Sequence, residues 1–147
     1  MIKTMEQWLT GKRLLIILTI AAAVWFSFTA VMTVLRYRLN YAPAYDFGIF
    51  SQMYYYMDKC LSPLTTCERD GLLSHFAVHL SPVFYVLLPF YKLVPRPETL
   101  LVLQSLVVIS GMVPLCLLTR AFGFTRPQTL CYGLMYCFYP AFMGGCF

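Results

Sequence analysis

Charged residues are absent from four long windows of this chain: 14–35, 71–91, 99–119 and 127–147. A helix rises about 1.5 Å per residue and the hydrocarbon core of a bilayer is about 30 Å thick, so about 20 apolar residues span it. Because lipid offers no partner for backbone polar groups, a spanning segment is expected to be helical. Three windows therefore predict transmembrane helices: 14–35, 99–119, in which Pro114 predicts a kink, and 127–147.

The remaining window differs from the others because it holds His75, His79 and the pair Ser81-Pro82. Serine followed by proline is typical of a helix start, which leaves 82–94 as a short apolar helix. Apolar stretches of about 10–14 residues are more often re-entrant or interfacial than spanning. We therefore expect an all-α membrane protein with three transmembrane helices and a juxtamembrane or re-entrant helix. The alternative is four transmembrane helices, with 82–94 spanning.

Composition supports a membrane location. Of the 147 residues, 60% are hydrophobic and only 12% are charged, about half of the ~25% that is usual in soluble domains. The net charge of +5 does not indicate a nucleic-acid partner, because a groove reader gathers its basic residues on one exposed face. Membrane lipid is the partner that this composition predicts.

Basic residues predict the orientation in the membrane. Lys12 and Arg13 directly precede the first span, and cytoplasmic flanks are rich in Lys and Arg. The apolar run is longer than the ~7–15 residues of a signal-peptide core, so it is interpreted as a signal anchor. We expect a multi-pass protein of the plasma (cytoplasmic) membrane with a cytoplasmic N-terminus and residues 36–81 as an outside loop. A turn at Gly123 and a capping box over Thr125–Gln128 separate the last two spans.

The outside loop holds most of the candidate chemistry, including four of the six acidic residues. Its first half predicts an aromatic interfacial helix over 47–57, because tyrosine is favoured at the membrane–water boundary. Asp46 directly precedes this helix. A carboxylate there either caps the helix N-terminus or serves as a general base or metal ligand.

Two histidines predict a second candidate site. His75 and His79 are four residues apart and so share one helix face, a spacing that suits two metal ligands. A metal site needs a third group, for which Asp46, Glu68 or Asp70 are candidates. The alternative interpretation is a pair of histidines at a polar interface.

Two cysteines of the outside loop, Cys60 and Cys67, lie where oxidising conditions allow a disulfide. A small bridged loop between them is therefore one expectation, and two free thiols are the other.

Three ordered motifs resemble those of one family. They are Tyr45-Asp46-Phe47-Gly48-Ile49-Phe50-x-Gln52, His75-Phe76-x-x-His79-x-Ser81-Pro82 and Leu88-Pro89-x-Tyr91-x-Leu93-x-Pro95-x-Pro97-x-Thr99-Leu100-x-Val102-Leu103-Gln104. Together they resemble the domain-of-unknown-function 2079 family of prokaryotic membrane proteins, from about Tyr41 to the C-terminus. That family is similar to membrane glycosyltransferases of the C-type fold, which use polyprenyl-phosphate-linked sugars.

The resemblance implies a function and a site. In the glycosyltransferase superfamily an acidic residue of the first outside loop is catalytic or metal-binding, and Asp46 matches that position. We accordingly expect transfer of a sugar from a polyprenyl-phosphate donor to an acceptor at the outer membrane face. A divalent metal, Mg or Mn, would be held by Asp46 with His75 and His79, and Tyr45, Gln52 and His75 would bind substrate. The superfamily also places juxtamembrane helices in this loop.

Two other functions remain alternatives. A membrane transporter or channel tends to carry ionisable residues inside its spans, and the spans predicted here contain no Asp, Glu, Lys or Arg. A non-catalytic membrane protein fragment is the other alternative. Because the chain stops inside or just past an apolar run, we expect the N-terminal portion of a larger polytopic domain. Its partner would be the remainder of its own full-length chain, and it would be inactive alone.

Overall fold

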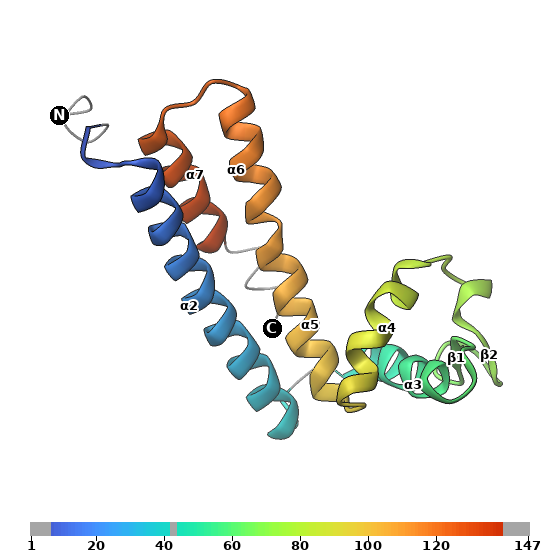
Figure 1. Ribbon diagram of the computed structural model, residues 1–147. Helices are drawn as coiled ribbons and strands as arrows, with labels where there is room; N and C mark the ends of the chain where they lie inside the picture. Colours follow the sequence, from blue (N-terminus) through green and yellow to red (C-terminus); the bar gives the residue numbers. More distant parts are fainter. Residues whose placement is uncertain (1–6, 42–43, 140–147) are drawn as a thin grey trace. The chain divides into compact units, whose positions relative to one another are not determined.

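The structure, a computed structural model, describes residues 7–41 and 44–139 and divides into two compact units. Residues 1–35 and 104–147 belong to the first, here called the bundle unit, and residues 36–103 form the second, the loop unit. The elements are α2 (Gly11–Arg38), α3 (Ala44–Cys60), β1 (Leu64–Thr65), β2 (Leu73–Ser74), the 3-10 helix η1 (His75–Ala77), α4 (Val83–Leu93), α5 (Pro97–Ser110), α6 (Met112–Ala121) and α7 (Arg126–Cys137) (Figure 1).

Helix α2 is the longest element and is apolar over most of its length. Its 28 residues extend about 42 Å, more than the thickness of a hydrocarbon core. Thr29 and Thr33 are buried in it, and their hydroxyls donate to the carbonyl oxygens of Trp25 and Thr29, both at 2.9 Å. The helix thus contains the predicted span 14–35 and extends it at both ends.

Helices α5 and α6 together form a second candidate span, Pro97–Ala121, of 25 residues. The interruption between them is at Gly111, whose φ of −61° and ψ of −16° remain helical. Pro114 accounts for it, because proline lacks an N–H and its ring crowds the carbonyl four residues earlier, that of Ser110. The predicted span 99–119 lies inside this segment.

Two helices among the described residues are long and apolar enough to cross a membrane. Helix α4 has 11 residues and is about 16 Å long, about half the thickness of the core, so it does not cross as a single helix. Of the predicted span 127–147, α7 covers the first part, and residues 140–147 lie outside the described residues. The described chain is mostly helical with two candidate membrane spans, and a third span stays a prediction.

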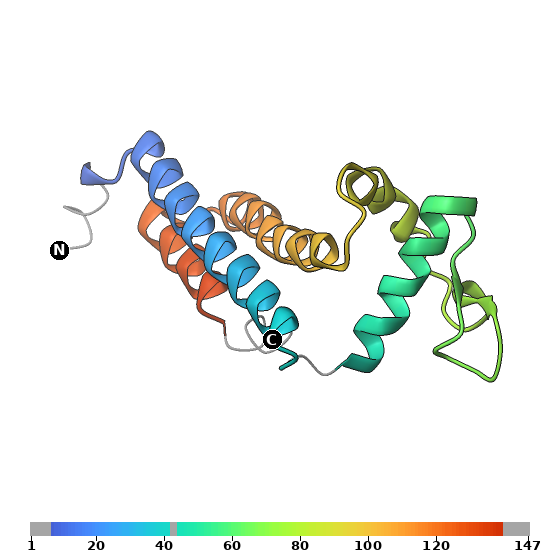
Figure 2. The same ribbon diagram turned by 90° about the horizontal axis from the view of Figure 1, so that it is seen from below.

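Apolar side chains from α2, α5, α6 and α7 hold the bundle unit together. The buried members of this core are Leu18, Trp25, Ile109, Met112 and Cys137. Gly133 permits a close approach of α7 to α2, since a Cβ there would lie 2.5 Å from Leu18 Cδ2. Figure 2 shows these two helices side by side.

A tight turn joins α6 to α7. Gly123 adopts a φ of +72°, which glycine does without steric cost. Thr125 precedes α7, and its amide donates to the side-chain oxygen of Gln128 at 2.9 Å. The predicted glycine turn and capping box are both confirmed.

Two short strands of the loop unit depart from the all-α prediction. Strands β1 and β2 pair antiparallel, with Leu64 opposite Ser74 and Thr65 opposite Leu73. Strands are recognised in a sequence by alternation over about four or more residues. Two-residue strands carry no such pattern, so the prediction missed them.

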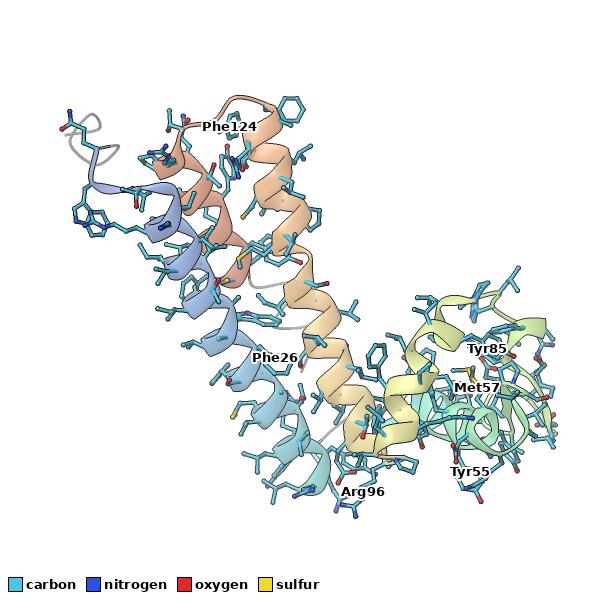
Figure 3. All side chains as sticks on the ribbon, viewed as in Figure 1. Phe26, Tyr55, Met57, Tyr85, Arg96 and Phe124 are labelled. Atoms are coloured by element: carbon cyan, nitrogen blue, oxygen red, sulfur yellow. The ribbon has the colours of Figure 1, made fainter. Side chains whose placement is uncertain are left out.

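Helix α3 packs one face against α4. Their shared core consists of Met53, Tyr54, Met57, Leu88 and Tyr91. Figure 3 shows Met57 in this core and Tyr55 directed away from it. The predicted interfacial helix 47–57 lies inside α3, but its tyrosines are not equivalent: Tyr54 is 3% exposed and Tyr55 is 56% exposed.

Candidate functional site

Gln52 on α3 binds the segment 61–82 between α3 and α4, here called the connector. Its side-chain oxygen accepts from Thr66 N at 2.8 Å and from Thr65 Oγ1 at 3.1 Å. Its amide nitrogen donates to Thr66 Oγ1 at 2.9 Å, and the Cys67 thiol lies 3.3 Å from Gln52 Oε1. One amide side chain therefore fixes three successive residues of the connector.

Two tyrosines bind the connector through its backbone. The hydroxyl of Tyr45, in the first turn of α3, donates to the carbonyl of Cys67. The hydroxyl of Tyr85, on α4, donates to the carbonyl of Leu61 at 2.8 Å. Backbone carbonyls outside helices and sheets need such partners. The connector is thereby tied to both helices that flank it.

Glu68 and His75 form a buried pair within the connector. Glu68 Oε1 lies 3.0 Å from His75 Nδ1, and the side chains are 8% and 3% exposed. The backbone is also fixed here, since the His75 amide donates to the Pro63 carbonyl at 2.7 Å. Glu68 Oε2 is buried and has no hydrogen-bond partner among the described residues. Most buried polar groups are hydrogen-bonded, so an unpaired carboxylate oxygen sets this pair apart.

Aromatic rings surround the His75 imidazole. Its centroid lies 5.7 Å from that of Phe50 on α3, 5.6 Å from that of Phe84 on α4 and 6.4 Å from that of Phe76. The exposed imidazole of His79 lies 5.7 Å away. Rings of α3, η1 and α4 thus enclose the buried pair, and His79 extends the group toward the surface.

Asp46 lies within the first turn of α3, because α3 begins at Ala44 and not after Asp46 as predicted. A carboxylate there interacts favourably with the helix dipole. Its side chain is exposed and takes part in no ion pair among the described residues. The next residue, Phe47, packs edge-on against Tyr37 with a centroid distance of 5.2 Å. This contact ties the start of α3 to the last turn of α2 and so positions Asp46.

Among the described residues, the predicted metal ligands are not brought together as a group of three, and a bound metal stays a prediction. In the part of the chain that the structure describes, no group of three or more His, Cys, Asp and Glu side chains is placed to hold a metal ion. His75 Nδ1 already faces Glu68. A set of Asp46 with His75 and His79 also fits poorly with Mg or Mn, which prefer oxygen ligands.

Cys60 and Cys67 are free thiols, so the disulfide considered from the sequence is not formed. Cys60 Sγ donates to the Tyr56 carbonyl at 3.1 Å, whereas Cys67 is held at Gln52. Gln52 and Cys60 are eight residues apart on α3, or about 12 Å along the helix. A disulfide needs Cα atoms within about 7 Å, which this attachment prevents.

Burial raises the pKa of Tyr54 from 10.0 to about 12. Its hydroxyl donates to the Phe84 carbonyl at 3.2 Å, and its ring packs against those of Phe84 and Tyr91. Burial also raises the pKa of Tyr91, and the charge of Asp58 adds to that rise. Both phenols are protonated at neutral pH, and both rings take part in the packing of α3 against α4.

Tyr45, Gln52 and His75, which were predicted to bind substrate, all use polar atoms to fix the connector. Sequence reasoning missed this role, and it considered Glu68 only as a metal ligand. The Tyr45 and Gln52 bonds join residues 13 to 22 positions apart. The periodicity of a helix or a strand carries no information about contacts between such distant residues. They become apparent only in the folded connector.

Comparison of the chain with curated proteins and with solved structures finds no match. A family match does exist over residues 35–147, and the family is described as "Predicted membrane protein (DUF2079)". The matched region covers most of the chain, including Asp46, the Glu68–His75 pair and the second candidate span. The chain therefore belongs to the DUF2079 family of predicted membrane proteins.

Proposed function

We propose that this chain is the N-terminal part of a membrane glycosyltransferase that moves a sugar from a polyprenyl-phosphate donor to an acceptor hydroxyl. The observation that carries the proposal is the exposed carboxylate of Asp46, placed shortly after the first candidate span. A lipid-linked donor keeps its phosphate at the membrane boundary. A carboxylate that follows a spanning helix by a few residues lies at the height where that phosphate meets water.

The order of elements gives further support. Two helices long enough to span, α2 and the α5–α6 segment, flank a unit that contains two shorter helices, α3 and α4. The C-type glycosyltransferases that this family resembles place juxtamembrane helices in the corresponding loop. Helix α4 is short and apolar, as a helix lying at or dipping into the membrane surface should be.

The proposed chemistry is a single displacement at the anomeric carbon. The acceptor hydroxyl oxygen forms a bond to that carbon as the Asp46 carboxylate takes the hydroxyl proton. The bond between the anomeric carbon and the phosphate oxygen breaks, and the polyprenyl phosphate leaves with the electron pair. Asp46 later releases the proton to water. Tyr45, Gln52 and His75 support this reaction by holding the connector beside α3.

The proposed orientation follows from the same reaction. Lipid-linked sugars are used at the outer membrane face, so the loop unit lies outside the cytoplasmic membrane and the N-terminus lies inside. Lys12 and Arg13, just before the apolar part of α2, agree with that orientation.

The test is sugar transfer by the full-length protein that contains this chain, reconstituted in proteoliposomes with a radiolabelled polyprenyl-phosphate sugar as donor. Asp46→Asn keeps the size of the side chain but removes its basicity, and we expect kcat to fall at least about 100-fold. Asp58→Asn is the matched control, since Asp58 lies near the other end of α3 and pairs with Lys59. If Asp46→Asn transfers sugar at the wild-type rate, Asp46 is not the base.

A further inference from the structure

The bundle unit contains a cavity of about 440 Å³. Its lining residues come from the start of α2, the end of α6 and the start of α7, three helix ends that Figure 1 shows at the same end of this unit. Its apolar wall includes Leu14, Leu15 and Leu18 of α2 and Phe124 of the α6–α7 turn. Arg120, in the last turn of α6, and Arg126, the first residue of α7, line the same cavity. Two guanidinium side chains therefore adjoin one apolar wall.

Thr129 gives this cavity a polar group without a partner. It lines the cavity and is 2% exposed, and its hydroxyl has no hydrogen-bond partner among the described residues. Other buried threonines of the bundle unit behave differently: the hydroxyls of Thr29 and Thr119 each donate to a helix carbonyl at 2.9 Å. A buried hydroxyl without a partner costs free energy. A ligand oxygen in the cavity would remove that cost.

The charged side chains that the structure describes in the bundle unit are all basic. Its described residues include Lys12, Arg13, Arg120 and Arg126 and no acidic residue. Arg13 is engaged with Trp8, whose carbonyl it contacts at 2.7 Å and whose ring it covers. Arg126 donates to the Leu9 carbonyl at a long 3.4 Å. Basic pockets between membrane helices on the cytoplasmic side attract anionic lipid headgroups.

We propose that this cavity binds an anionic phospholipid of the cytoplasmic leaflet. The lipid phosphate lies between Arg120 and Arg126, because a guanidinium fork matches the oxygens of a phosphate. The Thr129 hydroxyl donates to a phosphate or ester oxygen. An acyl chain lies along the α2 leucines, which a hydrated inorganic anion would leave uncovered. The site belongs to the bundle unit. Its place in the cytoplasmic leaflet rests on the proposed orientation, whereas the binding of an anionic lipid does not depend on the proposed sugar transfer.

Native mass spectrometry of the detergent-purified protein tests the proposal, with phosphatidylglycerol, phosphatidylcholine and glycerol 3-phosphate as probes. We expect retention of phosphatidylglycerol, with retention of phosphatidylcholine at least about tenfold weaker. Arg120→Gln/Arg126→Gln should weaken phosphatidylglycerol binding at least about tenfold, since hydrogen bonds to charged groups are lost. Lys12→Gln is the matched control, because it removes a positive charge at the same end without touching the cavity. The affinity of the Lys12→Gln variant for phosphatidylglycerol should stay within about twofold of that of the wild type.

Thr129→Val separates a binding role from a structural one. The change removes a hydroxyl that has no partner in the described chain, so the lipid-free protein should keep its melting temperature or gain in it. Phosphatidylglycerol binding should nevertheless weaken. A purely structural threonine would lower the melting temperature and leave lipid binding unchanged, which would count against the site.

Three outcomes would overturn the proposal. Equal retention of phosphatidylcholine would mean that the cavity does not select an anion. Glycerol 3-phosphate binding as tightly as phosphatidylglycerol would identify a soluble-phosphate site in place of a lipid site. An effect of Lys12→Gln equal to that of the arginine variants would assign the binding to surface charge outside the cavity.

Discussion

Glu68 Oε1 and His75 Nδ1 lie 3.0 Å apart in a position where water has little access to either side chain. The contact spans the connector between α3 and α4, and the imidazole is enclosed by rings from both helices. Each member lowers the free-energy cost of burying the other, because a buried polar or charged group without a partner is strongly destabilising. The connector is therefore expected to open when either member is removed.

Replacing Glu68 or His75 by alanine should loosen the connector more than replacing Glu68 by glutamine. Glu68→Ala and His75→Ala should each destabilise the closed connector by about 3–5 kcal/mol, because the remaining group stays buried and unpaired. Glu68→Gln keeps an acceptor for His75 and should cost less. Maleimide labelling of Cys67, read by peptide mass spectrometry, measures the opening, and we expect its rate to rise at least about 100-fold in the alanine variants.

Cys60 is the internal control for this labelling, because its thiol is exposed in the native protein. Its rate should be similar in all variants. Unchanged labelling of Cys67 in both alanine variants would show that the Glu68–His75 pair does not hold the connector.

Gln52 should be replaceable by glutamate but not by leucine. Glutamate retains oxygens that accept from the Thr66 amide and the Thr65 hydroxyl, and the Thr66 hydroxyl can rotate to donate to it. Gln52→Leu removes these acceptors, so the Thr66 amide should exchange with deuterium at least about tenfold faster. Hydrogen exchange of connector peptides, with α4 peptides as the control, measures this difference. Equal exchange in the two variants would remove Gln52 from its assigned role.

The sequence predicts the elements that are marked by a long apolar segment or by a short local motif such as a helix cap. Absence of charge over 14–35 predicted α2, and the spacing of Thr125 and Gln128 predicted the cap of α7. The same reasoning placed α4 and limited its length. What it did not predict depends on contacts between distant residues. The pairing of β1 with β2 and the binding of Tyr45 and Gln52 to the connector arise only once the chain has reversed direction.

The site was predictable to the extent that it is local. The position of Asp46 at the start of a helix followed from the sequence, although the helix begins earlier than predicted. Glu68 was named for a metal role because acids and histidines near one another suggest ligands. In the structure it pairs with His75 instead, since the connector turns back between them.

Alkaline pH should destabilise the protein through Tyr54. Below pH 10 the phenol is protonated in both the folded and the unfolded state, so it adds no pH dependence. Between pH 10 and about 12 it ionises only in the unfolded state, because burial raises its pKa in the folded state to about 12. Stability is therefore lost as the pH rises through this range, by about 1 kcal/mol between pH 9 and pH 11.

Urea unfolding at pH 9 and pH 11 checks this pH dependence. Tyr54→Phe should lose the hydrogen bond to the Phe84 carbonyl, yet its stability should fall less between the two pH values than that of the wild type. Tyr55→Phe, at a neighbouring exposed position, should behave as the wild type does. A Tyr54→Phe variant with the full wild-type loss would assign the alkaline sensitivity to other groups.

Two opposing effects on stability meet at Gly111: helix propensity favours alanine there, and steric overlap with Tyr136 opposes it. A double variant of Gly111 and Tyr136 separates the two effects. Alanine is a better helix former than glycine by about 1 kcal/mol, and Gly111 has helical angles, so propensity alone predicts that Gly111→Ala stabilises. A Cβ at this position, however, would lie 2.2 Å from Tyr136 Oη. Tyr136 is held in place by its hydrogen bond to the Val108 carbonyl. We therefore expect Gly111→Ala to destabilise the bundle unit by about 1–3 kcal/mol, as overpacking does.

The double variant Gly111→Ala/Tyr136→Phe removes the oxygen that causes this overlap. The nearest remaining ring atom is Tyr136 Cζ, at 3.1 Å from the added Cβ, which a small shift of the ring relieves. The Gly111→Ala change should thus cost at least about 1 kcal/mol less in the Tyr136→Phe background than in the wild type. Thermal unfolding of all four proteins in the same detergent gives this coupling energy. Equal costs in the two backgrounds would mean that α6 and α7 do not meet at this pair.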